Sequence, residues 1–163
     1  MPTVSWTSAG IIEAMKPTGL AILIRDTSDW GLDLPGWEKE TFFFDDISWG
    51  DLHPIAWLLW DVSIAGRPLS DICGTGGISR LCGLRTGARP FLESDADRLI
   101  GIVDRASARN IDVTVACTYG RSRSRAVAEW IAGYCPGYRL TPGNLSGIPN
   151  DRITDMLGRR HHR

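Results

Sequence analysis

The sequence contains little lysine, little histidine and no long apolar run. Lys16 and Lys39 are its only lysines beside 16 arginines, and the formal net charge is −1. So small a charge provides no field that would attract nucleic acid or anionic lipid. No stretch approaches the about 18 apolar residues of a membrane span, and polar Ser5 and Thr7 do not fit the basic-then-apolar order of a secretion signal. We therefore expect a cytoplasmic protein with no membrane partner and no nucleic-acid partner.

Residues that bind metals are also sparse. His53 is the only histidine before the C-terminal pair His161 and His162, and Cys73 and Cys82 lack a second ligand pair at regular spacing. A structural zinc site needs a complete set of such ligands, so we expect no metal and no cofactor. Without a secretion signal, the four cysteines are expected to be reduced thiols. A redox role for Cys73 and Cys82 stays open, although simple burial explains them better.

Length and apolar content indicate one domain. With 163 residues, 43% of them hydrophobic, the chain can bury one sizeable core, and we expect a single domain over residues 1–163. Short continuous apolar runs predict buried strands at 20–24, 41–44 and 111–116. Apolar residues at helical spacing predict helices at 94–110, 124–132 and 151–157. Ser94 is the predicted cap of the first of these helices.

The order of these elements predicts the fold class. A helix, a strand and a second helix follow one another between residues 94 and 132. This order indicates a layered α/β fold whose central strands are parallel and flanked by helices. Ligands of such sheets bind at the carboxyl ends of the strands. The Pro- and Gly-rich tail at 139–149 should wrap the surface, and residues 159–163 should be frayed.

The most distinctive pattern lies where a predicted strand meets a predicted helix. Cys117 is followed at the sixth position by Arg123, with Gly120 between them and Ser124 after the arginine. The backbone N–H groups of such a turn, the positive end of the helix and a guanidinium together form a cradle for a tetrahedral dianion. A thiol at the base of this cradle can attack phosphorus once it is ionised.

The other cysteines show that this pattern is specific. An arginine six positions after a given cysteine has a chance of about one in ten in this composition. Cys73, Cys82 and Cys135 are followed at that position by residues other than arginine. Requiring also the glycine and the serine lowers the chance to about a few in a thousand. We therefore interpret the whole turn as phosphate-binding: Thr118, Tyr119, Gly120, Arg121, Ser122 and Arg123.

The segment from Ala116 to Ser124 resembles the active-site loop of the cysteine-dependent protein tyrosine and dual-specificity phosphatases. Four further segments are similar to the compact bacterial and phage branch of that superfamily: residues 20–26, 42–47, 90–104 and 148–150. The similarity covers most of the chain except residues 48–89. The resemblance implies a phosphatase-like layered fold with an insertion before the helix that precedes the catalytic strand.

The insertion at residues 48–89 is rich in tryptophan and glycine. Its tryptophans are Trp49, Trp57 and Trp60. We expect a short apolar helix at 53–60 and a loop or hairpin at the glycine-rich residues 74–77. Because an insertion beside a site shapes access to it, this segment is the predicted specificity element.

The resemblance also implies a role for each matching residue of the loop. Cys117 would be the nucleophile, and Arg123 would hold two phosphate oxygens and the charge that develops in the transition state. Ser124 would donate a hydrogen bond to the sulfur as it leaves the phosphoenzyme. The superfamily usually has a histidine before the cysteine, where this chain has Ala116.

The leaving oxygen needs a proton, and the resemblance implies that an aspartic acid on a separate loop supplies it. Asp46, in a family-like context after the second predicted strand, is the residue that the resemblance favours. The neighbouring carboxylate and three acids of the insertion are the alternatives: Asp45, Asp51, Asp61 and Asp71.

These features predict metal-independent hydrolysis of phosphate monoesters through a phosphocysteine. The resemblance implies a phosphotyrosine or dual-specificity protein phosphatase, with a phosphorylated protein or another phosphate monoester as partner. A phosphate or sulfate ion should be able to occupy the loop. Two other classes stay open: a phosphate-binding module with weak turnover, and a rhodanese-like sulfurtransferase, whose loops place the arginine closer to the cysteine.

Overall fold

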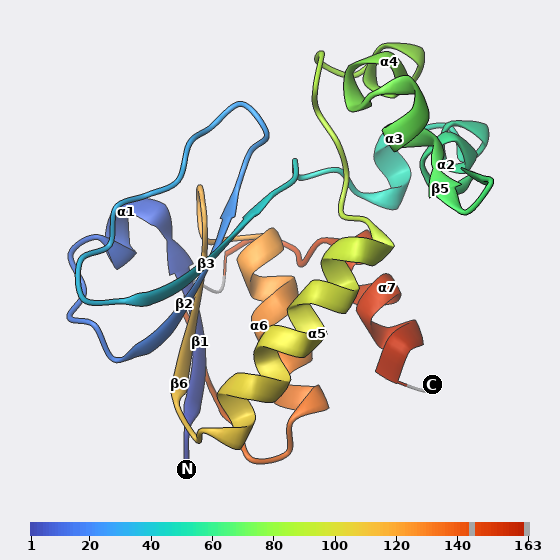
Figure 1. Cartoon of the computed structure of the whole chain (residues 1–163). Coiled ribbons are helices and arrows are strands. Elements are labelled where there is room, and N and C mark those ends of the chain that lie inside the picture. The colour runs from blue at the N-terminus through green and yellow to red at the C-terminus, as the bar shows by residue number, and fades with distance from the viewer. Residues whose placement is uncertain (144–145, 162–163) are drawn as a thin grey trace.

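Five parallel strands form the central sheet of the computed structural model (Figure 1), which describes residues 1–143 and 146–161. The strand order is β3-β2-β6-β1-β7, and every neighbouring pair is parallel. The strands are β1 (Thr3–Ser8), β2 (Gly19–Arg25), β3 (Glu38–Phe43), β6 (Asp112–Cys117) and β7 (Arg139–Thr141). The predicted α/β fold with parallel central strands is confirmed.

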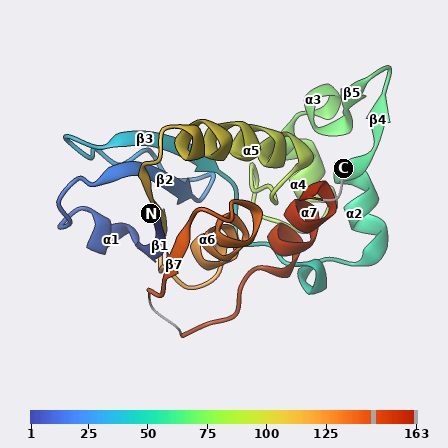
Figure 2. The same cartoon turned by 90° about the horizontal axis from the view of Figure 1, so that it is seen from below.

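Helices cover both faces of this sheet, but unequally. The larger layer contains α5 (Glu93–Ala108), α6 (Arg123–Tyr134) and α7 (Asp151–His161). The short α1 (Ala9–Ile12) lies on the opposite face, as the two views in Figures 1 and 2 show. The predicted flanking helices are therefore confirmed, and none of the described helices is long and apolar enough to cross a bilayer.

The alternation of side chains along β2 separates two apolar clusters. Leu20, Ile22 and Ile24 join the large cluster that α5, α6 and α7 cover. Ala21 and Leu23 point the other way, into the smaller cluster beside α1. Complete burial of one such aliphatic side chain contributes about 1.5–3 kcal/mol. The continuous apolar run of β2 is thus explained by burial on both faces of the sheet.

The insertion forms a helical unit next to α7 and the start of α5 (Figures 1 and 2). It contains a 3-10 turn at Trp49–Asp51, α2 (Pro54–Asp61), β4 (Ser63–Ile64), β5 (Arg67–Pro68), α3 (Leu69–Cys73) and α4 (Thr75–Leu81). A third apolar cluster holds it together, built mainly from Trp57, Trp60 and Ile78 with Ile47 and Leu52. The predicted helix at 53–60 is confirmed, with His53 as its N-cap.

Several expectations about secondary structure were wrong. The glycine-rich segment is part of a helix, α4, because the fully buried Ile78 anchors it to the third cluster despite the glycines. Ser94 lies inside α5, whose first turn is instead capped by the Asp95 carboxylate accepting the Leu92 N–H at 2.9 Å. Residues 3–8 form a strand that the sequence analysis did not predict.

The C-terminal part also differs from expectation. The tail does not only wrap the surface, since residues 139–141 pair with β1 as the edge strand β7. Helix α7 continues past the predicted end at Leu157 to His161. Arg159 and Arg160 are helical and form ion pairs, so they are not frayed. The last two residues of the expected frayed tail lie outside the described residues.

Candidate active site

Cys117 ends the central strand of the sheet. It pairs in register with Ser8 of β1 on one side and Ile24 of β2 on the other. The turn that follows leads directly into α6, which begins at Arg123. The Cys117 side chain is 3% exposed and belongs to the large apolar cluster. The predicted strand, loop and helix are therefore all present, with the sulfur at the carboxyl edge of the sheet.

Gly120 lets the loop fold tightly against the neighbouring strand. Its φ is +65°, and a Cβ atom at this position would lie 2.5 Å from the backbone of Thr7 and Ser8. Only glycine combines this left-handed conformation with so close an approach. The glycine in the motif is thus required by the local backbone, independently of any family resemblance.

Ser124 lies against the sulfur. Its Oγ is 3.1 Å from the Cys117 Sγ, and both side chains are buried. Because Ser124 is in the first turn of α6, its hydroxyl is at the positive end of the helix. A hydroxyl at this distance can donate a hydrogen bond to the sulfur.

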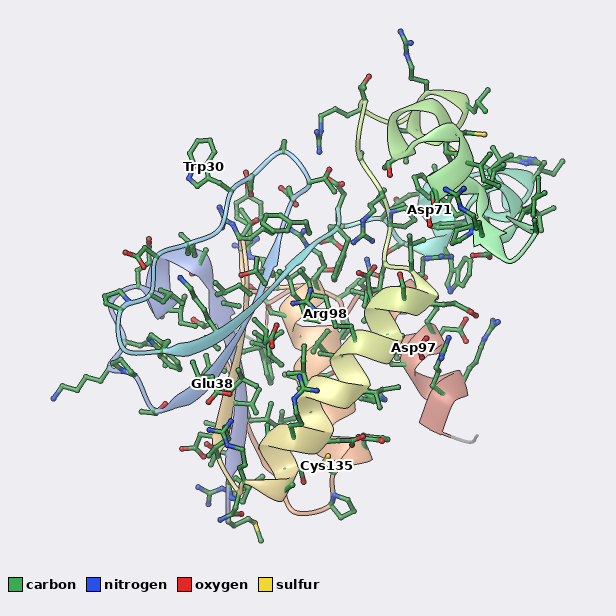
Figure 3. The ribbon with its side chains drawn as sticks, viewed as in Figure 1. Trp30, Glu38, Asp71, Asp97, Arg98 and Cys135 are labelled. Atoms are coloured by element: carbon green, nitrogen blue, oxygen red, sulfur yellow. The ribbon has the colours of Figure 1, made fainter. Side chains whose placement is uncertain are left out.

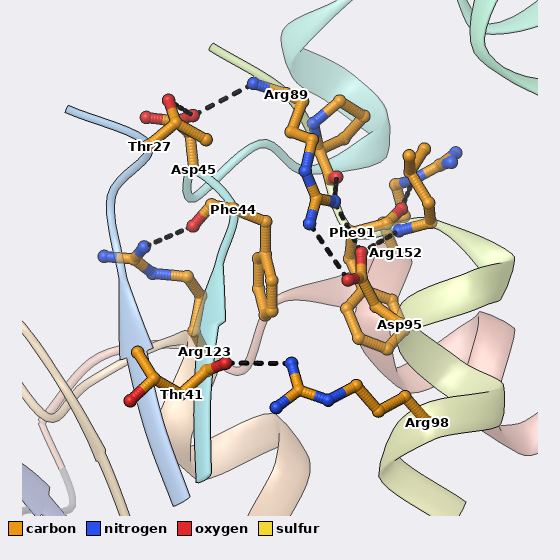
Figure 4. A network of polar contacts seen from close by, with 12 residues as sticks. Thr27, Thr41, Phe44, Asp45, Arg89, Phe91, Asp95, Arg98, Arg123 and Arg152 are labelled. Carbon is orange, nitrogen blue, oxygen red and sulfur yellow. Dashed lines mark hydrogen bonds and ion pairs between the residues drawn. The ribbon is translucent and has the colours of Figure 1, made fainter. Parts of the chain in front are cut away.

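Arg123 is held in place by three groups. Its Nη1 donates to the Phe44 carbonyl oxygen at 2.7 Å (Figure 4) and lies 2.6 Å from Asp26 Oδ1. Its Nη2 donates to Thr118 Oγ1 at 3.4 Å. The residue is 3% exposed, and its Nε has no hydrogen-bond partner among the described residues. The guanidinium is therefore an oriented, buried cation next to the loop.

Asp46 is hydrogen-bonded to the loop that follows Cys117. One of its carboxylate oxygens, Oδ1, accepts hydrogen bonds from Ser122 Oγ at 2.9 Å and from Asn150 Nδ2 at 2.8 Å. No hydrogen bond from a described residue reaches the other oxygen, Oδ2. Asp46 follows β3, as predicted, and its side chain is exposed. Oδ1 therefore fixes the orientation of the carboxyl group, and Oδ2 is left to contact a ligand.

A pocket of about 260 Å³ joins these groups. Its lining residues are Asp46, Cys117, Tyr119, Arg121, Ser122 and Arg123. Tyr119 is 74% exposed and Arg121 is also exposed, so both side chains lie at the rim. The predicted nucleophile, the predicted phosphate-binding arginine and the predicted acid thus line one cavity. Arg125, just beyond the motif, is instead paired with Glu129 at 2.7 Å.

Asp45, the neighbouring alternative, has a different environment. Its Oδ2 accepts hydrogen bonds from Thr27 Oγ1 at 2.7 Å and from the Arg89 N–H at 3.0 Å (Figure 4), and its Oδ1 accepts one from Arg85 at 2.8 Å. Both oxygens are therefore engaged in joining three segments. This arrangement indicates a structural role for Asp45.

The acids of the insertion lie elsewhere. Asp51 accepts a hydrogen bond from the Ser48 N–H at 2.6 Å, and Asp61 pairs with Arg152 at 3.4 Å. Asp71 is an exposed residue of α3, within the insertion (Figure 3). The pocket at Cys117 is lined by none of the three. Asp46 is the only acid among its described lining residues.

All four cysteines are free thiols. Cys73 and Cys82 both lie in the insertion, where Cys82 Sγ is 3.8 Å from the Ala56 carbonyl oxygen. Burial raises the pKa of the Cys82 thiol, which makes it less reactive. Cys135 follows α6 at the end opposite the loop (Figure 3). The structure thus joins neither Cys73 nor Cys82 in a disulfide.

Two residues that contact the predicted site were not among the predicted site residues. Asp26 and Asn150 lie only within the family-like segments 20–26 and 148–150. Each contacts a predicted site residue, Arg123 and Asp46 respectively. A signal existed for Asp26, since it follows a buried strand that we expected to be parallel to the catalytic one. We see no comparable local signal for Asn150.

Searches with this chain among protein-family models, curated proteins and solved structures found no match. The chemistry proposed for this site therefore rests on its own geometry. That geometry combines a buried thiol, an adjacent hydroxyl, an oriented guanidinium and a carboxylic acid around one small cavity.

Proposed function

We propose that this protein is a cytoplasmic, metal-independent phosphatase that hydrolyses phosphate monoesters through a phosphocysteine, of the protein tyrosine or dual-specificity kind. The observation that supports it most is the Cys117 sulfur 3.1 Å from the Ser124 hydroxyl, in a pocket that Arg123 and Asp46 also line. Few other reactions use a buried thiol, a guanidinium and a carboxylic acid at an anion-binding turn.

In the first step the Cys117 thiolate attacks phosphorus. The S–P bond forms as the ester P–O bond breaks, and the leaving oxygen takes a proton from the Asp46 carboxyl group. The guanidinium of Arg123 and the N–H groups of the loop hold the three non-bridging oxygens of the phosphoryl group. The products of this step are an alcohol or a phenol and the phosphocysteine.

In the second step water attacks the phosphocysteine. Asp46, now a carboxylate, accepts a proton from the water as the new P–O bond forms and the S–P bond breaks. The Ser124 hydroxyl donates a hydrogen bond to the departing sulfur, which leaves as thiolate. Inorganic phosphate is released, and the enzyme returns to its starting protonation state.

The rim of the pocket suits a phosphorylated side chain of a protein. Tyr119 and Arg121 are both exposed there, where an aromatic ring can contact an aryl phosphate and a guanidinium can contact a neighbouring acidic group. A phosphorylated protein is therefore the proposed substrate class, and inorganic phosphate or sulfate should bind in its absence.

One observation supports a second candidate, a phosphate-binding module with weak turnover. The position before the cysteine is Ala116, whose side chain is buried in the small cluster beside α1 and offers no hydrogen bond to the loop. Such a loop would keep its backbone donors and Arg123, and it could bind a phosphate dianion without attacking it. Binding of phosphate esters without hydrolysis would be its signature.

Turnover of para-nitrophenyl phosphate separates these candidates. We expect hydrolysis by the wild type, unchanged by a metal chelator and abolished in Cys117→Ser. Cys73→Ser is the matched control, because that exposed thiol lies in the insertion, and it should retain wild-type activity. Binding of the ester without turnover would support the module instead. Thiocyanate formation from thiosulfate and cyanide would support a sulfurtransferase and overturn the proposal.

A further inference from the structure

The first turn of α7 connects the pocket with the insertion. Its preceding residue, Asn150, is 1% exposed and donates through Nδ2 to Asp46 Oδ1 at 2.8 Å. The Asn150 Oδ1 accepts the Ile153 N–H at 3.1 Å, so the same side chain caps the helix. Asn150 is therefore fixed at both ends of its amide, with one end on α7 and the other on the proposed acid.

The next two residues bind the insertion. Asp151 Oδ1 accepts the Trp49 N–H at 2.9 Å. The Arg152 guanidinium lies 4.6 Å from the Trp49 ring and 4.2 Å from the Trp57 ring, and its Nη2 is 3.4 Å from Asp61 Oδ1. Three consecutive residues, Asn150 and the first two residues of α7, therefore lie between the insertion and the pocket.

Burial of the charged Arg152 side chain costs free energy. It is 0% exposed, and its Nη1 has no hydrogen-bond partner among the described residues. Its Nε donates to the Phe91 carbonyl oxygen at 2.9 Å (Figure 4). Burial lowers the pKa of Arg152, against the pull of Asp61. A buried ion of this kind adds little stability compared with an apolar residue, but it fixes the position of the helix through directed contacts.

The insertion is also connected to Asp46 through the main chain. Ile47, the residue directly after Asp46, belongs to the cluster that contains Trp57 and Ile78. The acid is thus attached to the insertion through the chain on one side and through α7 on the other. Movement of the insertion relative to the sheet would displace both attachments together.

We propose that Asn150 is a positioning residue for Asp46, and that the insertion fixes the position of Asn150 through its contacts with Arg152. This inference rests on the proposed function, since it assigns the insertion a part in protonating the leaving group. Asn150 directs its donor to Oδ1, so that Oδ2 carries the proton toward the substrate. The insertion then serves catalysis from outside the pocket.

Substrates with different leaving groups test the role of Asn150. Phenyl phosphate has a basic leaving group that needs an acid, whereas para-nitrophenyl phosphate needs one much less. Asn150→Ala should lower kcat for phenyl phosphate about ten- to a hundredfold, with the para-nitrophenyl ester within about twofold. Thermal unfolding of the variant, followed by circular dichroism, checks that the fold is intact.

Asn150→Asp is a sharper second variant. It keeps an oxygen for the Ile153 N–H but replaces the donor at Asp46 with a second carboxyl group. A like charge favours the protonated acid, so the alkaline limb of the pH profile for phenyl phosphate should move up by about one pH unit. An unchanged limb would show that residue 150 does not contact the catalytic acid during turnover.

Arg152→Met tests the contribution of the insertion. Methionine can pack against the two indole rings without the charge, and it should lower kcat for phenyl phosphate about three- to tenfold with the para-nitrophenyl ester unchanged. Arg159→Met is the matched control, since the partner of this exposed α7 residue within the described part of the chain is Asp155 at 2.7 Å. Combined with Asn150→Ala, Arg152→Met should add less than its separate effect.

The outcomes distinguish this inference from the proposed function. If the wild type hydrolyses neither ester, the phosphatase proposal itself fails. If the wild type hydrolyses both, and Asn150→Ala lowers both equally or neither, the enzyme stands and the positioning role is wrong. If Arg152→Met has the same kcat for phenyl phosphate as the wild type, the insertion does not contribute to catalysis through Arg152.

Discussion

Asp26 and Arg123 form an ion pair across the carboxyl edge of the sheet, with Asp26 Oδ1 2.6 Å from Arg123 Nη1. Asp26 follows β2, and Arg123 opens the helix that follows the adjacent strand β6. The aspartate is 37% exposed and the arginine 4% exposed in their side chains. The carboxylate therefore both orients the guanidinium and offsets the charge that a bound phosphate dianion would meet.

Asp26→Asn should strengthen phosphate binding. The asparagine keeps an oxygen near Nη1 but removes the negative charge that competes with a dianion for Arg123. The inhibition constant of inorganic phosphate should fall about three- to tenfold, measured by competition against para-nitrophenyl phosphate. Asp29→Asn, whose residue pairs with Arg25 at 3.3 Å, should leave this constant unchanged. Weaker phosphate binding in Asp26→Asn would show that orientation outweighs charge.

Substitution of Asp45 should mainly affect stability, whereas substitution of Asp46 should mainly affect catalysis. Asp45→Asn replaces a carboxylate that accepts three hydrogen bonds with a neutral amide. The free energy of unfolding in urea should therefore fall by about 1–3 kcal/mol. Its preference between phenyl and para-nitrophenyl phosphate should stay that of the wild type. Asp46→Asn should instead lower kcat for phenyl phosphate about a hundredfold or more.

The reverse pattern would exchange the two assignments. A large, selective loss on phenyl phosphate in Asp45→Asn, with Asp46→Asn active, would identify Asp45 as the acid. Both variants need comparison at several pH values, because removal of the acid also removes the alkaline limb of the profile.

Gly120→Ala should disrupt the loop. The added Cβ would lie 2.5 Å from the backbone of Thr7 and Ser8, at a φ of +65°. The strained backbone should lower the free energy of unfolding by about 1–3 kcal/mol, measured by urea titration, and turnover should fall with it. Gly133→Ala is the control: this helical glycine of α6 has no neighbour within 4 Å of the added Cβ. That variant should gain about 0.5–1 kcal/mol.

Stability should fall in alkaline solution partly because of Cys135. Burial raises the pKa of the Cys135 thiol and Asp104 adds to the rise, against a hydrogen bond to Ser107 that lowers it. The unfolded chain therefore loses this proton first, at about pH 8.5. The stabilising contribution is complete below that pH and is lost as the pH rises through the higher folded value.

Replacement of the Cys135 thiol tests whether it contributes to the loss of stability at alkaline pH. Cys135→Ala should flatten the decline of the unfolding free energy between about pH 8 and pH 10, although it lowers stability at neutral pH by about 1 kcal/mol through the small cavity it leaves. Cys73→Ala, at an exposed thiol, should not alter the pH dependence. A slope in Cys135→Ala equal to that of the wild type would contradict the assignment.

The parts of the fold that could be predicted from sequence were those set by local pattern. The apolar run of β2 and the helical spacing in α5 and α6 predicted these elements within a few residues. The mixed polar and apolar strand β1 was missed, because Val4 and Trp6 alternate with hydroxyl side chains whose pairing with β6 is visible only in the sheet. Helix α4 was missed because tertiary burial of Ile78 overrides the poor helix propensity of its glycines.

The sequence by itself determined the loop: Cys117, Gly120 and Arg123 are close together along the chain, and a strand, a tight turn and a helix leave them one arrangement. Their catalytic roles stay predictions. Only the tertiary structure decided that Asp26, Asp46 and Asn150 meet this loop, because they are separated from it by long stretches of chain, and the sheet order and the docking of α7 bring them together. Contacts within a turn follow from local backbone geometry, whereas contacts between distant segments depend on how the whole core packs.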